Sequence, residues 1–170
     1  MKLILLVILT FNVIVSFAAE CPDIPFVSNF QPKRFLGKWR AIQTTGLDMA
    51  CGGFDISGPE GSGKYNVHLL PVKIDVKMRL NRPNDFSSGF TEESPIELMN
   101  KANLKIFATD YDNYAGVVEC KNDDGLYFVS ATISSRSGVL SNDIVQNLKA
   151  QLVNYGVDVS GFKIIRQDIC

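Results

Sequence analysis

The chain has 170 residues, with 17 Lys and Arg against 18 Asp and Glu, which gives a formal net charge of −1. Nucleic-acid-binding proteins carry a clustered basic face and membrane-surface proteins carry a polybasic patch, and this sequence has neither. The length and the 46% hydrophobic content suit one domain with its own core.

Residues 1–18 have the character of a secretory signal peptide. Lys2 precedes an apolar run from Leu3 to Phe17, and Ser16-Phe17-Ala18 fits the small-residue pattern of a cleavage site. An N-terminal membrane anchor is the less favoured interpretation, because the run is short for a span and no cationic stop follows it. We therefore expect a secreted, extracellular domain of residues 19–170 that does not insert into a membrane.

Alternating apolar and polar residues predict a series of strands separated by turn residues. The predicted strands are residues 37–45, 51–57, 64–70, 73–81, 103–110, 113–121 and 125–135. In the first of them, Trp39, Ala41 and Gln43 should share a face. Residues 81–102 give the weakest signal, with a short strand near Phe86 to Thr91 and the segment 95–100 as its competitor. This regular spacing indicates an antiparallel sandwich or barrel.

One later segment changes to the period of a helix. Apolar residues recur on one helical face at Ile144, Leu148, Leu152 and Tyr155. Ser141 or Asn142 can cap the start of this helix, and Gly156 suits its end. A short strand at residues 162–166 should follow.

The cysteines and the one histidine bear on chemistry. An even number of cysteines in a secreted chain implies disulfides, and three pairings are open for Cys21, Cys51, Cys120 and Cys170. A metal site is not predicted, since there is no C-x-x-C motif. His68 lies on the strand face opposite to Tyr65, Val67 and Leu69, which argues against a general base and against haem ligation. We predict no catalytic residues and no enzymatic activity.

Three short motifs occur in order along the chain. They are Gly37-Lys38-Trp39, the segment TDYDNYA at residues 109–115, and Arg136. Together they resemble the lipocalin family, and most closely its branch with insecticyanin, bilin-binding protein and apolipoprotein D. The resemblance implies an all-β fold, an eight-stranded antiparallel up-and-down β-barrel with one C-terminal α-helix packed outside, and a small apolar ligand in the lumen.

The resemblance also assigns roles to individual residues. It pairs Cys21 with Cys120 and Cys51 with Cys170. It places Trp39 across the closed end of the barrel beneath Arg136, as a cation–π pair. The motif residues expected to shape that end are Gly37, Trp39, Thr109, Asp110, Tyr111 and Arg136.

The apolar strand faces give the candidate ligand-binding residues. These are Tyr65, Val67, Leu69, Val76, Met78, Leu104, Ile106 and Phe128. Filling a dry core is the alternative role for each of them. The resemblance puts a bilin such as biliverdin first as ligand, followed by a retinoid, a fatty acid or a carotenoid. The other functions left open are a protein-interacting or protease-inhibiting lipocalin and a haem or amine scavenger, and pairing with another copy as a homo-oligomer is also left open.

Overall fold

Strands that are neighbours in the sequence pair in antiparallel fashion, except for the last strand, which pairs with the first. A computed structural model describes residues 20–46, 50–58, 64–70, 78–81, 88–93 and 101–170. The strands are β1 (Gly37–Thr44), β2 (Gly53–Ser57), β3 (Lys64–Leu70), β4 (Met78–Asn81), β5 (Gly89–Glu93), β6 (Asn103–Thr109), β7 (Tyr114–Asp123), β8 (Leu126–Ser135) and β9 (Lys163–Ile164). The helices are α1 (Pro32–Phe35) and α2 (Asn142–Asn154).

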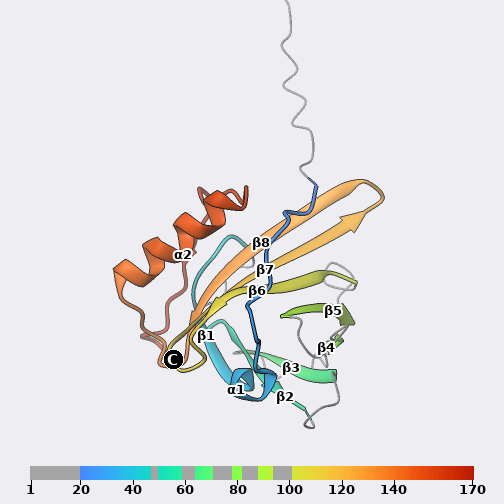
Figure 1. Cartoon of the computed structure of the whole chain (residues 1–170). Coiled ribbons are helices and arrows are strands. Elements are labelled where there is room, and N and C mark those ends of the chain that lie inside the picture. Colours follow the sequence, from blue (N-terminus) through green and yellow to red (C-terminus); the bar gives the residue numbers. More distant parts are fainter. Residues whose placement is uncertain (1–19, 47–49, 59–63, 71–77, 82–87, 94–100) are drawn as a thin grey trace, which may run out of the picture.

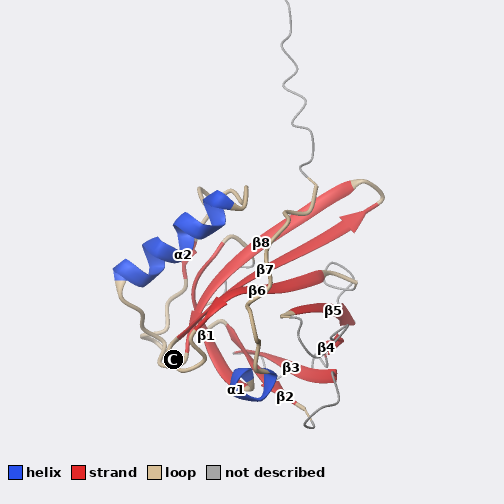
Figure 2. Ribbon diagram, in the orientation of Figure 1, coloured by secondary structure: helices blue, strands red, loops and turns tan. Residues whose placement is uncertain are grey.

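The first strand closes the sheet into a barrel. The pairing runs without interruption from β2 through β8 to β1, and β1 pairs again with β2. Gly37 to Arg40 oppose β2, whereas Arg40 to Thr44 oppose β8. The curled sheet and the helix α2 outside it can be followed in Figure 1 and Figure 2. The predicted eight-stranded antiparallel barrel with a late outer helix is confirmed.

The predicted face of β1 is correct only for its first half. The register shifts between Ala41 and Gln43, which marks a bulge. After it Thr44, rather than Gln43, opposes Thr132 and is buried, at 4% exposure. A bulge adds one residue to one strand, so the alternation beyond it is inverted. The prediction that Gln43 shares the face of Trp39 and Ala41 is therefore wrong.

Several boundaries differ from the sequence predictions or lie beyond what the structure describes. The short helix α1 was not predicted; Pro32 begins it, as proline's fixed φ allows. The strand expected near Phe86 to Thr91 is β5, displaced toward its C-terminal side. The signal peptide at residues 1–18, the first part of the strand predicted over 73–81 and the competing segment 95–100 lie outside the described residues.

Two apolar clusters occupy the two faces of the sheet. One lies inside the barrel and includes Trp39, Ile106 and Val117. The other lies between the outer face and α2, where Leu148 and Leu152 are almost fully buried. The predicted cap is present, since the backbone N–H of Ile144 donates to Ser141 Oγ at 3.4 Å. Neither described helix combines the length and the apolar character needed to span a membrane.

Two disulfides tie segments near the chain ends to the barrel. Cys21 bonds to Cys120 in β7, and Cys51, just before β2, bonds to Cys170. Both pairings implied by the resemblance are therefore confirmed. Each closes a long loop in the unfolded chain, which stabilises a fold by about 2–4 kcal/mol.

Candidate functional site: the barrel interior

Trp39 fills the interior at one end of the barrel. Its side chain is 0% exposed, and its indole Nε1–H donates to the carbonyl oxygen of Phe35 at 2.9 Å. The ring of Phe35, from α1, lies 5.0 Å from that of Trp39. Buried indole N–H groups need such an acceptor, and α1 supplies it. This end of the interior is therefore closed by packed aromatic rings.

Arg136 covers the same ring from the end of β8. Its guanidinium carbon lies 3.6 Å from the centre of the Trp39 ring, a close cation–π contact. The guanidinium also donates to three backbone carbonyl oxygens, those of Arg34, Lys38 and Tyr111, at 2.8, 3.0 and 3.1 Å. One side chain thus joins α1, β1 and the β6–β7 turn. The stacking of Arg136 on Trp39 expected from the resemblance is present.

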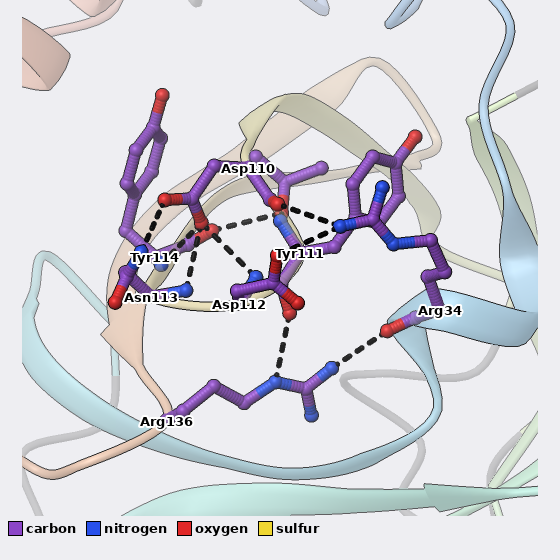
Figure 3. Close-up of polar contacts among 8 residues, drawn as sticks. Arg34, Asp110, Tyr111, Asp112, Asn113, Tyr114 and Arg136 are labelled. Carbon is purple, nitrogen blue, oxygen red and sulfur yellow. Dashed lines mark hydrogen bonds and ion pairs between the residues drawn. The ribbon is translucent and has the colours of Figure 1, made fainter.

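The β6–β7 turn completes the closed end (Figure 3). Asp110 Oδ1 accepts hydrogen bonds from the backbone N–H groups of Asp112, Asn113 and Tyr114 at 3.2, 2.8 and 3.0 Å. Burial raises the pKa of Asp110, but these hydrogen bonds outweigh it and leave the pKa below its ordinary value. Arg34 pairs with Asp112 at 2.8 Å and lies over the ring of Tyr111. The turn is held as one rigid unit.

We expect Arg136→Ala to lower the free energy of unfolding by about 1–2 kcal/mol, because the stacking and the cover over the ring are lost. Urea unfolding followed by Trp39 fluorescence measures this. Arg136→Lys should restore little of the loss, since an ammonium cannot donate to several carbonyls in a plane. A large loss of ligand affinity at unchanged stability would contradict this assignment, because it would show that Arg136 and Trp39 lie at the end where a ligand binds.

Above the closed end, the interior wall is apolar. The buried side chains around Trp39 come from four other strands and are Ile56, Phe90, Ile106, Ala115 and Val117. The registers place their strands side by side, with Phe90 opposite Leu104 and Ile106 opposite Val117. A continuous apolar face of this kind suits contact with a ligand of similar character.

The predicted ligand-binding residues differ in how far the structure buries them. Leu104 is half-buried on this wall, Ile106 is fully buried deeper in the same cluster, and Phe128 is 47% exposed toward the end of the β7–β8 hairpin. In the backbone register, Val67 opposes Ile56 and Met78, Leu69 opposes Phe54, and Tyr65 opposes Leu80. Val76 lies outside the described residues. Ligand contact by each of these residues stays a prediction.

Two acidic residues on the interior face were not anticipated. Glu92 in β5 is 0% exposed, and no hydrogen-bond partner for either carboxyl oxygen is present in the described part of the chain. Glu119 in β7 is half-buried; it opposes Leu104 and Ser130, and Ser130 Oγ donates to it at 3.2 Å. The interior therefore contains two carboxyl groups in addition to the apolar residues predicted from the strand faces.

The environment raises the pKa of both carboxyls. Burial, and then repulsion from Glu119, raise the pKa of Glu92 from 4.5 to about 9. Burial also raises the pKa of Glu119, against a smaller opposing effect of its bond to Ser130. At neutral pH, Glu92 is therefore protonated in the folded protein.

Of these two residues, Glu119 lies in β7, and the alternation of that strand bears on which way its side chain points. Val117, Glu119 and Lys121 fall on one face, and Val118 and Cys120 on the other. Sequence reasoning treats the apolar face as the buried one. In the structure Val118 and Cys120 are buried beneath the outer segments, while Val117 and Lys121 are buried as well. Both faces of β7 are covered, so alternation alone could not say which face was the interior.

The structure also has a pocket of about 300 Å³. It runs beneath the N-terminal segment, between Pro22 and Phe26 on one side and Thr91 and Lys105 on the other. Phe26 remains 53% exposed beside it, with Lys105 Nζ 5.4 Å from its ring centre.

Comparison with known proteins agrees with this geometry. Residues 79–168 match the family model of the lipocalin / cytosolic fatty-acid binding protein family, which is more than half of the chain. The chain belongs to the lipocalin family. The motifs at the closed end are the ones from which the sequence resemblance was drawn.

Curated relatives and solved structures extend the match along this lipocalin. It is 28% identical over 160 residues to apolipoprotein D of Cavia porcellus, covering 89% of this chain and 84% of that protein. Among solved structures, insecticyanin from the tobacco hornworm Manduca sexta has a TM-score of 0.66 at 21% identity, covering 88% of this chain and 87% of the other. Lobster apocrustacyanin A1 has a TM-score of 0.65 at 23% identity, covering 79% and 78%. At these identities the structural matches establish the fold alone.

Proposed function

We propose that this lipocalin is an extracellular carrier that holds one small, mainly apolar molecule in the barrel interior. The observation that carries the proposal is the apolar wall above Trp39, which is sealed at one end by packed rings and by Arg136. Such a wall is typical of sites that bury most of a ligand's surface. The two disulfides support an oxidising, extracellular location, as does the predicted signal peptide.

The family resemblance supports an order of trial for the ligand. A bilin such as biliverdin comes first, then a retinoid, a fatty acid and a carotenoid. A binding role is favoured over catalysis because all four cysteines are bonded in pairs, which leaves no thiol nucleophile. The domain that would perform this role is residues 19–170, after removal of residues 1–18.

Titration with biliverdin, retinol and a long-chain fatty acid should show saturable binding of at least one of them, at about one molecule per chain. Burial of a few hundred Å² of apolar surface, less the cost of association, supports micromolar or tighter affinity. Quenching of Trp39, the one tryptophan of the chain, and equilibrium dialysis of the disulfide-bonded protein give two independent measurements. Dissociation constants all above about 100 µM would contradict the carrier proposal.

Substitution inside the barrel provides the matched control for this titration. Leu104 is half-buried on the interior wall, so Leu104→Trp should occupy ligand space and reduce affinity at least about tenfold, read by dialysis. Leu126 is 62% exposed at the start of β8, and Leu126→Trp should leave affinity unchanged. Equal effects of both variants would show that the ligand does not enter the interior.

A protein-binding role is the second candidate, and one observation favours it. Leu126, Phe128 and Val129 are 62%, 47% and 36% exposed on the β7–β8 hairpin, which extends away from α1 and the closed end (Figure 1). Exposed apolar side chains clustered on one hairpin are typical of interaction sites. If no small molecule binds, this hairpin is where a protein contact should be sought.

A further inference from the structure

The interior polar groups gather away from the Trp39 end. Glu92 is the next-to-last residue of β5, and its backbone bonds to the segment that enters β6, with its N–H donating to the carbonyl oxygen of Ala102 at 2.9 Å. Glu119 lies on β7, the strand on the other side of β6, opposite Leu104. The two carboxyls therefore flank the interior side of β6, above the apolar cluster that surrounds Trp39.

The carboxyl of Glu92 lacks the hydrogen-bond partners that a buried polar group ordinarily has. The side chain is 0% exposed, and both of its oxygens are without a hydrogen-bond partner among the described residues. A buried polar group without a hydrogen-bond partner destabilises the folded state, and such groups are rare in folded proteins. A ligand group that donates hydrogen bonds to this carboxyl would remove that destabilisation.

We propose that the interior selects ligands with a positively charged amine at one end, held by Glu119 and Glu92, with an apolar body packed against Leu104 and Phe90. This rests on the carrier function proposed above and names the chemical class of its ligand. Glu119 is half-buried and Glu92 is 0% exposed, so Glu119 is the more accessible of the two carboxyls.

The chemistry of the wall favours a cation over an anion. When both carboxyls are ionised they provide four acceptor oxygens, and one of these, Glu119 Oε2, receives a hydrogen bond from Ser130 at 3.2 Å. A protonated amine has three donors and no acceptor, so it complements this set. A carboxylate placed there would face two acids, and a ligand that carries carboxylates must direct them to the rim instead.

The groups around Glu92 do not oppose the preference for a positively charged ligand group. Its register neighbours are Leu80 in β4 and Ala102 before β6, both apolar. Lys101, whose backbone N–H donates to the carbonyl oxygen of Glu92, has an exposed side chain. Lys121 lies two residues beyond Glu119 on the same face of β7, is 8% exposed and is not without an interaction partner.

Amine binding has a proton balance that can be measured. Glu92 is protonated in the free protein at neutral pH, and an ammonium group beside it favours the carboxylate. The Glu92 O–H bond breaks as the ammonium enters, the electron pair stays on the carboxylate, and the proton passes to the solvent. Up to about one proton should be released per ligand bound at pH 7.

A matched series of ligands tests the proposal. Dodecylamine, dodecanol and dodecanoic acid share one apolar chain and differ in the head group. They are titrated into the full disulfide-bonded protein below their micelle concentrations, with isothermal calorimetry in two buffers of different ionisation enthalpy. We expect the amine to bind at least about tenfold more tightly than the acid, with the alcohol between them, and only the amine to release a proton.

Two variants and one control complete the test. Glu119→Gln should bring the amine and acid affinities within about threefold of each other, and Glu92→Gln should abolish proton release. Glu20→Gln, at an exposed position of the N-terminal segment, should change neither result. Thermal unfolding of each variant checks that it is folded.

The outcomes separate this inference from the carrier function. If none of the three ligands binds, the amine inference fails, and the titration with biliverdin and retinol decides the carrier function separately. If the acid binds as tightly as the amine, the amine inference fails while the carrier function stands. If the alcohol binds most tightly and no proton is released, the interior does not select a positively charged group. The protonated carboxyl of Glu92 then acts as a neutral hydrogen-bond donor.

Discussion

Glu92→Gln should make the protein more stable at alkaline pH and leave its stability near pH 5 little changed. The pKa of Glu92 is about 9 in the folded protein against 4.5 ordinarily. Between these values the folded protein keeps a proton that the unfolded chain releases. Stability is therefore full below about pH 4.5 and is lost as pH rises through about 9, with a limiting slope of about 1.4 kcal/mol per pH unit. Glutamine cannot ionise, so it removes this loss.

Urea unfolding at intervals from pH 5 to pH 8 measures the effect, which can reach about 4 kcal/mol at the limiting slope. Asp123→Asn is the control, because Asp123 is an exposed carboxyl at the end of β7. That variant should retain the pH dependence of the parent protein. Parallel profiles for the parent protein and Glu92→Gln would show that Glu92 is not the group responsible.

Gly53→Ala should lower the free energy of unfolding by about 2–4 kcal/mol. A Cβ atom at this position would collide with the carbonyl oxygen of Trp39 and would lie 3.0 Å from the Cα of Arg40. Both are backbone atoms of β1, so no side-chain rotation relieves the contact. The strain falls where β1 and β2 close the barrel, since Gly53 opposes Arg40 there.

Gly161→Ala is the control for this substitution, because a Cβ atom at Gly161 meets nothing within 4 Å. Its effect should stay within about 0.5 kcal/mol. Chemical unfolding of both variants, together with the near-ultraviolet circular dichroism of Trp39, distinguishes a local adjustment from loss of the closed end. A Gly53→Ala variant as stable as the parent would mean that β1 and β2 can move apart at little cost.

Much of the fold could be predicted because several strands show a clear alternation of apolar and polar residues. Residues 64–69 alternate between polar and apolar side chains, and β3 has the predicted bounds, Lys64–Leu70. The helix α2 was predictable for the same kind of reason, since its apolar face has a helical period and Ser141 precedes it. Local patterns suffice where one face of an element is buried and the other is wet.

The candidate site was harder to predict because it depends on contacts between distant segments. The bulge after Ala41 inverts which residues of β1 face the interior, and it is visible only in the pairing with β8. Glu119 lies on a strand covered on both faces, so its direction could not be decided from alternation. Glu92 lies in residues 81–102, where the sequence gives the weakest strand signal. Its burial depends on β5 lying beside β4 and β6.

The confinement of Trp39, Arg136 and the β6–β7 turn to one end of the barrel has a consequence for how this protein can change over evolution. These groups secure the fold at a distance from Glu92 and Glu119, and substitutions at well-separated sites add nearly independently in free energy. Residues around Glu92 and Glu119 can therefore change, and with them the ligand that we propose, while the closed end continues to supply the stability that such substitutions require.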